Sequence, residues 1–172
     1  MSPSARGHRH DPSGAEPRIL SLQTAGQPSL RTLLESIVTD TARSLRDRGL
    51  PPVAVMLDVG VGHGVATDPA LLEPLLHTAV LRAVELSTSP AGGSDVPHIA
   101  EVVVTSIDVG DAIEIEIADA GPALPATTRS PSEELRHLAD RAGAAISAVD
   151  CPQGGVAVTL RFPHRRARSL AA

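Results

Sequence analysis

Two neighbouring segments with the alternation typical of β-strands constrain the fold more than any other feature of this sequence. In residues 112–119 (AIEIEIAD), isoleucine alternates with glutamate. Because successive side chains of a strand point to opposite faces of a sheet, this alternation predicts a strand with one buried face. Residues 101–108 (EVVVTSID) also have strand character, and only Val109, Gly110 and Asp111 separate the two segments. The pair is therefore predicted to form an antiparallel hairpin.

Two helices are predicted before the hairpin. The first follows Ser29 as N-cap and ends at Gly49. The second covers residues 68–87, with Asp68 as cap and Pro69 at the first helical position. Pro74 lacks a backbone N–H, so we expect a kink or a fresh helix start near Glu73. The broad apolar face of this helix, which we expect in the core, consists of Leu72, Leu75, Leu76, Ala79, Val80, Ala83 and Val84. The polar side chains on its other side are Glu73, His77, Thr78, Arg82 and Glu85.

A third helix follows the hairpin. Ser130, Pro131 and Glu133 predict a capping box with proline at the first helical position, and Gly143 marks the end. Further strands are predicted over residues 53–59, 145–149 and 156–162, the last two around the turn CPQGG. The order helix, strand, helix, two strands, helix, two strands favours an α/β two-layer sandwich. We expect a mixed sheet with helices on one face, not a doubly wound parallel sheet.

Length, charge and composition exclude several classes of protein. The 172 residues correspond to one domain, and no apolar run reaches the length of a membrane helix or forms a secretory signal, so we expect a cytoplasmic protein. The net charge of −5 and a single aromatic residue argue against nucleic-acid binding. We expect a disordered tail over residues 1–17, the domain over 18–164 and a basic tail over 165–172.

Two glycine-containing segments are candidates for binding phosphate or a nucleobase. In residues 57–65 (LDVGVGHGV) the glycine spacing does not match a dinucleotide fingerprint, and the chain has no lysine for a P-loop. We interpret this segment as a flexible turn. In residues 117–125 (IADAGPALP), Asp119 follows the predicted strand and Gly121 comes two residues later. A carboxylate there can accept a hydrogen bond from the amine of adenine, and glycine lets the ring approach the backbone. An ordinary turn is the alternative.

Three segments together resemble the ATP-binding domain of sensor histidine kinases, the GHKL superfamily with its Bergerat fold. They are DPALLEPLLHTAVLRAVELS (68–87), IEIADAGPALP (115–125) and GAAISAVDCPQGGVAVTLRFP (143–163). The segment at 29–59 is similar to the opening helix and strand of that domain. The resemblance covers residues 29–163 and implies a histidine kinase-like ATPase fold, an ATP or ADP site and a role in bacterial two-component signalling.

The motif residues of that superfamily are only partly present. Arg82 stands where the superfamily has an asparagine that binds magnesium, with Thr78 one turn earlier, and the chain contains no asparagine. Asp119 and Gly121 match the first glycine box, whereas Ala123 replaces its second glycine. Gly155 matches the last turn. The segment ATTRSPSEE (126–134) stands where the superfamily has its ATP lid, and no second glycine box is recognisable. A guanidinium cannot bind a metal cation but can pair with phosphate, so magnesium is not expected.

These departures leave three functional hypotheses. The leading one is a degenerate, pseudokinase-like module that signals mainly through contacts with a protein partner, with weak or absent nucleotide binding. Its partner surface would include the helix at 68–87, the loop at 87–97 and the shortened lid. The second is an ATP-binding histidine or serine kinase-type module in which Arg82 replaces the metal ligand. Because phosphoryl transfer needs metal, phosphate cradle and lid together, we assign no catalytic residue. The third is a structural domain with an empty pocket.

Overall fold

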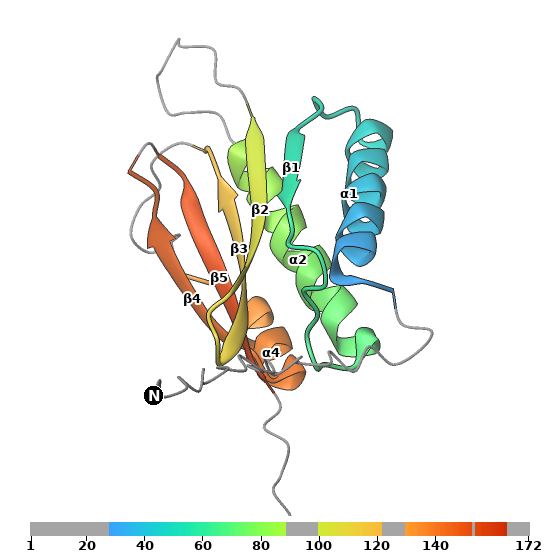
Figure 1. Cartoon of the computed structure of the whole chain (residues 1–172). Helices are drawn as coiled ribbons and strands as arrows, with labels where there is room; N and C mark the ends of the chain where they lie inside the picture. The colour runs from blue at the N-terminus through green and yellow to red at the C-terminus, as the bar shows by residue number, and fades with distance from the viewer. Residues whose placement is uncertain (1–27, 89–99, 122–129, 153, 165–172) are drawn as a thin grey trace, which may run out of the picture.

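The computed structural model describes residues 28–88, 100–121, 130–152 and 154–164. They form three helices and five strands (Figure 1). In chain order these are α1 (Leu30–Asp47), β1 (Ala54–Asp58), α2 (Pro69–Ser87), β2 (Glu101–Asp108), β3 (Ala112–Asp119), α4 (Glu133–Ala142), β4 (Ala145–Asp150) and β5 (Val156–Pro163). The predicted order of elements is confirmed. The predicted tails, at 1–17 and 165–172, lie outside the described residues, so the domain boundaries stay predictions.

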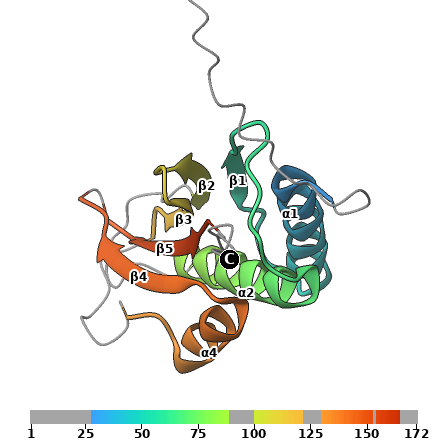
Figure 2. The ribbon, with the colours of Figure 1, turned by 60° about the horizontal axis from the view of Figure 1, so that its bottom comes forward.

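The five strands form one mixed sheet in the order β1-β2-β3-β5-β4. Strand β1 is parallel to β2, and every other pair is antiparallel, including the predicted β2–β3 hairpin. All three helices lie on the same side of the sheet (Figure 2). The α/β two-layer sandwich that the sequence predicts is therefore confirmed.

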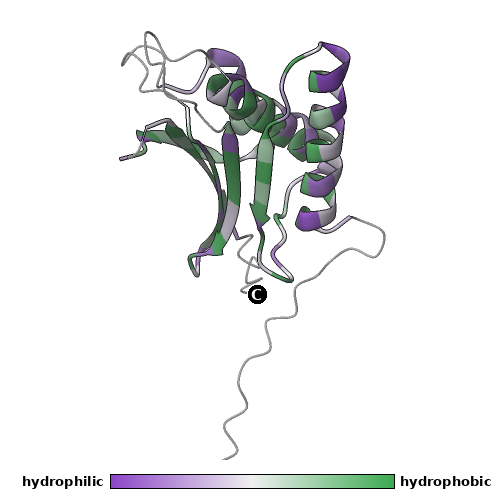
Figure 3. Ribbon diagram, turned by 90° about the horizontal axis from the view of Figure 1, so that it is seen from above, coloured by the Kyte–Doolittle hydropathy of each residue, from purple (hydrophilic) through white to green (hydrophobic). Residues whose placement is uncertain are grey.

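The core lies between this helix layer and the sheet. Hydrophobic residues, green in Figure 3, predominate in the strands and in α2, where the two layers meet. Leu75, Leu76, Val80 and Val84 of α2 are fully buried, and the predicted apolar face of this helix is confirmed. The isoleucines of β3 are at most 3% exposed, which confirms that the hairpin buries one face. Since α2 lies centrally and contacts both α1 and α4, it anchors the helix layer.

The expected fresh helix start near Glu73 is wrong. Helix α2 runs without interruption from Pro69 to Ser87, with Pro74 inside it. Pro74 is exposed, whereas Leu72 and Leu75 on either side are buried. Packing of these leucines therefore holds the second turn together although one backbone hydrogen bond is missing. None of the helices in the described part of the chain is long and apolar enough to cross a membrane.

The predicted N-cap of α4 is also wrong by two residues. Ser132, not Ser130, caps this helix: its hydroxyl accepts a hydrogen bond from the Leu135 N–H at 3.2 Å. Pro131 therefore precedes the helix instead of occupying its first turn. Both serines are followed by suitable residues, and burial of Leu135 decides between the two registers, because this leucine must point into the core. At the other end, Gly143 takes the left-handed conformation, φ 72°, as predicted.

The two serines before α4 give a direct test of this register. We expect Ser132→Ala to lower the free energy of unfolding by about 1 kcal/mol, because the Leu135 N–H loses its acceptor. Ser130→Ala is the matched control and should change it by less than about 0.5 kcal/mol. Urea unfolding followed by circular dichroism measures both variants. A larger loss for Ser130→Ala would contradict the observed cap.

Candidate nucleotide site

A hollow opens between α2 and the sheet, and its lining brings together segments that are far apart in the sequence. Its cavity volume is only about 20 Å³, and the empty space around it, which includes open solvent, is about 340 Å³. Helix α2, strands β3 and β5, and the start of α4 all contribute to it. The lining residues are Ala79, Arg82, Ala83, Leu86, Ile117, Asp119, Pro131, Leu135, Val156 and Val158. We call this the central hollow. An apolar cavity with few polar groups is the usual form of a small-molecule site.

Asp119 lies in the central hollow at the end of β3, and it is only 4% exposed. Its carboxylate accepts two backbone hydrogen bonds, from the Gly121 N–H at 2.8 Å and from the Val156 N–H at 3.1 Å. An ionised carboxylate has about four acceptor positions, so about two remain. The two amides hold the carboxylate in place and leave it able to accept a hydrogen bond from a ligand.

Two glycines make room for this carboxylate, and both were predicted as site residues. A Cβ on Gly121 would lie 2.6 Å from the Asp119 Oδ1 and 2.8 Å from the Leu86 carbonyl oxygen. Gly155 has φ +81°, and a Cβ there would overlap the Asp119 carbonyl oxygen. The structure therefore brings Asp119, Gly121 and Gly155 together. Ala123, predicted with them, lies outside the described residues.

Arg82 lines the central hollow from α2. It is half-buried, as is Thr78, so neither lies on a fully solvated face as the helical spacing suggested. Within the described residues, no hydrogen bond or ion pair holds the Arg82 guanidinium. Thr78 is not part of the lining. The structure thus groups Arg82 with Asp119 and leaves Thr78 outside.

The residues of the central hollow do not fit a magnesium ion. Mg²⁺ binds oxygen ligands, and Arg82 offers only N–H donors. The Asp119 carboxylate is the one acidic group in the described lining, and it already accepts two amide N–H groups. Across the described residues, His, Cys, Asp and Glu side chains form no group of three or more that could hold a metal ion. A bound magnesium ion is therefore not part of the chemistry assigned to this hollow.

Sequence reasoning did not identify the apolar walls of the site. Ala79 and Leu86 lie three residues before and four residues after Arg82, which places all three on one side of α2. This helical spacing is the signal that could have found them. Pro131 and Leu135 carry no such signal, because only the packing of α4 against α2 brings them to the site.

The first glycine-containing segment is a turn, as interpreted, and it does not reach the central hollow. The His63 Nδ1 lies 2.7 Å from the Ser106 hydroxyl, which also accepts the Gly60 N–H at 3.0 Å. Ser106 is on β2 and is 7% exposed. This segment is therefore tied to the sheet by its side chains, and α2 begins only at Pro69, so no helix N-terminus follows it directly.

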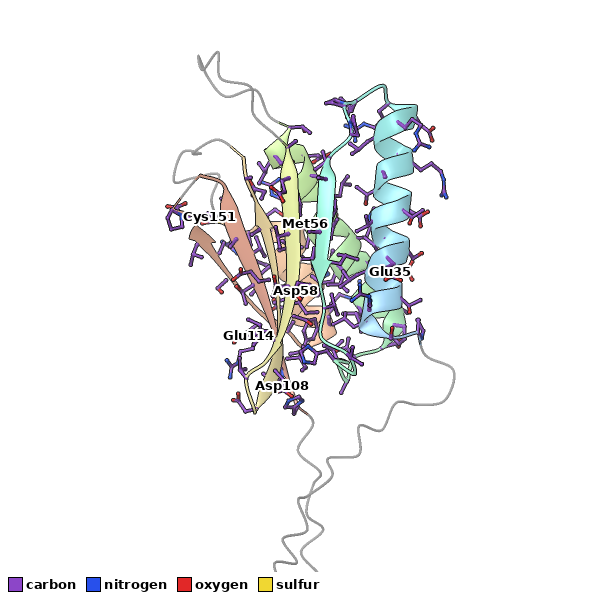
Figure 4. All side chains as sticks on the ribbon, turned by 45° about the horizontal axis from the view of Figure 1, so that its top comes forward. Glu35, Met56, Asp58, Asp108, Glu114 and Cys151 are labelled. Atoms are coloured by element: carbon purple, nitrogen blue, oxygen red, sulfur yellow. The ribbon has the colours of Figure 1, made fainter. Side chains whose placement is uncertain are left out.

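Cys151 lies close to the site, and its surroundings do not activate the thiol. It was expected to be exposed, whereas it is half-buried at the end of β4, and Figure 4 places it at the end of the sheet opposite Asp108 and Glu114. Burial, together with the negative charges of Asp119 and Glu116, raises the pKa of the Cys151 thiol. A raised pKa keeps the thiol protonated at neutral pH, which lowers its reactivity.

Comparison with known proteins identifies this arrangement of elements. No family model and no curated protein matches the chain. Among solved structures, the catalytic domain of histidine kinase ThkA is similar over 79% of this chain and 94% of its own, with a TM-score of 0.60 and 16% identity. ThkA has also been solved in complex with the response regulator TrrA.

Two further histidine kinases are similar to the chain. The cytoplasmic segment of QseC matches 83% of this chain and 76% of its own, with a TM-score of 0.54 and 22% identity. The blue-light activated histidine kinase EL346 of Erythrobacter litoralis matches 76% of this chain and 40% of its own, with a TM-score of 0.53 and 18% identity. The resemblance found in the sequence is thus confirmed at the level of the fold: this chain has the fold of histidine kinase catalytic domains.

Proposed function

We propose that this protein is an adenine-nucleotide-binding domain of a signalling protein, with Asp119 contacting the base and Arg82 facing the phosphate. One observation carries the proposal: a nearly buried carboxylate and a guanidinium that pairs with no described residue line the same apolar hollow. Of the three hypotheses that the sequence leaves open, this geometry favours nucleotide binding.

The chemistry of the central hollow suits adenine. Its walls are aliphatic, as the flat faces of a purine require, and Asp119 accepts hydrogen bonds in a position fixed by two amides. Adenine carries an exocyclic amine that can donate to this carboxylate. A purine with an oxygen at that position would place an acceptor against an acceptor, which is unfavourable.

The proposal does not include phosphoryl transfer. That reaction depends on groups that position and neutralise the phosphates, and a metal ion normally supplies much of the charge. In the described part of the hollow, Arg82 is the single cation. We therefore propose a domain that senses a nucleotide, and we assign no catalytic residue.

A role in signalling by protein contact is part of the proposal. The complex of ThkA with a response regulator supports a protein partner for this fold. The partner surface suggested by the sequence is only partly available on α2, which is packed between α1 and α4; its exposed residues include Glu73, Pro74 and Glu85. The rest of that predicted surface, residues 89–97 and the first part of the shortened lid, lies outside the described residues. We propose that a nucleotide bound against α2 changes the position of this helix, and that a partner on the helix layer detects the change.

Base discrimination tests the proposed function. Isothermal titration calorimetry of the purified chain, in excess chelator, should show binding of ATP and at least about tenfold weaker binding of inosine triphosphate, which has an oxygen in place of the amine. The two ligands carry the same phosphates, so each is the control for the other. Equal affinities would contradict recognition of the base by Asp119. Absence of binding by both, in chelator and in magnesium alike, would contradict nucleotide binding.

A further inference from the structure

The central hollow contains one positive and one negative side chain among its ten described lining residues. Arg82 and Asp119 are the charged pair, and the other eight are apolar. The Asp119 carboxylate accepts the backbone amides of Gly121 and Val156, and in the proposed function it also accepts the base, whereas no described residue pairs with Arg82. The part of a ligand that lies next to Arg82 is therefore expected to be a small anionic group.

We propose that the site takes an adenine mononucleotide or the metal-free form of a longer adenine nucleotide, and that magnesium weakens the binding of ATP and ADP. This inference rests on the proposed function. In the bound form of the ligand, one phosphate pairs with Arg82 and no metal ion is bound to that phosphate.

The reason lies in competition for the same phosphate oxygens. A guanidinium binds phosphate through two parallel N–H···O bonds, and these need free oxygens in one plane. Mg²⁺ binds the same oxygens, keeps several waters and reduces the negative charge of the nucleotide. It would also place a second cation against Arg82, with no additional described carboxylate in the lining to compensate. The magnesium complex therefore fits worse than the free nucleotide.

The size of the magnesium effect should depend on the number of phosphates. Magnesium bridges neighbouring phosphate groups in nucleotide complexes. AMP has one phosphate, so it cannot form such a bridge, and a single guanidinium can pair with that phosphate fully. We therefore expect magnesium to leave the affinity for AMP unchanged, to lower it for ADP and to lower it most for ATP.

Calorimetric titrations of the purified chain with AMP, ADP and ATP, each in excess chelator and in excess magnesium, test this inference. The affinity for ATP should fall at least about fivefold in magnesium. AMP is the internal control, because its affinity should be the same in both buffers. Tighter or equal binding of ATP in magnesium would overturn the inference while leaving the proposed function intact. A failure of all three nucleotides in both buffers would overturn the proposed function itself.

Variants of Arg82 test whether this side chain is the cause. Arg82→Ala should weaken AMP binding in chelator by about tenfold to a hundredfold, because the charge-assisted hydrogen bonds to phosphate are lost. Arg82→Asn, which replaces the cation with an oxygen ligand, should remove the penalty that magnesium imposes on ATP. Arg46→Ala is the matched control: it removes the same charge from the exposed surface of α1 and should leave the affinities unchanged. A magnesium penalty that persists in Arg82→Asn would overturn the assignment to Arg82.

Discussion

Gly155→Ala is expected to destabilise the domain by about 3–5 kcal/mol, at the upper end of single-substitution effects. Gly155 has φ +81°, a conformation that costs a residue with a Cβ about 1–2 kcal/mol. The larger part of the effect is steric, because the new methyl group would overlap the backbone carbonyl oxygen of Asp119. Both the new methyl group and the carbonyl oxygen that it meets are fixed to backbone, so no side-chain movement can relieve the overlap. Strand β5 would have to move away from β3.

Gly143→Ala is the matched control for this substitution. Gly143 has a similar φ, +72°, but a Cβ there would meet nothing within 4 Å. We expect it to cost only the conformational part, about 1–2 kcal/mol. Urea unfolding of both variants, followed by circular dichroism, separates the steric effect from the conformational effect. Equal losses would contradict the close approach of Gly155 to Asp119. The Gly155→Ala variant should also lose nucleotide binding, since the shift displaces the carboxylate.

Asp119→Ala is expected to lower both stability and nucleotide affinity. The substitution leaves the N–H groups of Gly121 and Val156 without their acceptor in a buried place, and each such loss costs about 1–3 kcal/mol. We therefore expect the free energy of unfolding to fall by about 2–5 kcal/mol. ATP binding in excess chelator should fall below detection, because the apolar walls alone cannot orient the base.

Asp119→Asn keeps the binding prediction testable if the alanine variant does not fold. Its amide oxygen can still accept one of the two N–H groups, so the loss of stability should be about half as large. The affinity for ATP should nevertheless fall at least about tenfold, because the amide N–H₂ group presents a donor where the carboxylate accepted. Glu116→Gln is the matched control: it lies on the same strand, is exposed and faces away from the hollow. Calorimetry measures the ATP affinity of both variants at a temperature where both are folded. Equal affinities would contradict the role of Asp119.

Much of the candidate site was predictable because its evidence is local in the chain. Asp119 and Gly121 are two residues apart at the end of a strand whose alternation is unmistakable, so their proximity follows from the strand itself. Arg82 lies on a helix that one continuous segment predicts, from its N-cap and apolar spacing, but its place in the site was predicted from the resemblance alone. Ala123 was predicted from the resemblance to the first glycine box of the superfamily, and it lies outside the described residues.

The position of Gly155 under Asp119 depends on contacts between distant segments. The two residues are brought together by the pairing of β3 with β5, in which Ala118 is opposite Ala157, and no local pattern specifies that register. The orientation of Arg82 is a similar case. Helical spacing assigned it to the polar side of α2, whereas the packing of α4 against α2 makes that side a wall of the hollow.

The sequence by itself determined the order of elements, the mixed sheet with helices on one face, and the caps of α1 and α2. These properties follow from periodicity and from the conformational preferences of serine, aspartate, proline and glycine, which act within a few residues. Tertiary structure decided three other features: Ser132 as the cap of α4, the continuity of α2 through Pro74, and the closure of the central hollow around Asp119 and Arg82. In each of these, several local arrangements cost nearly the same, and burial of apolar side chains such as Leu135 and Leu75 selects one of them.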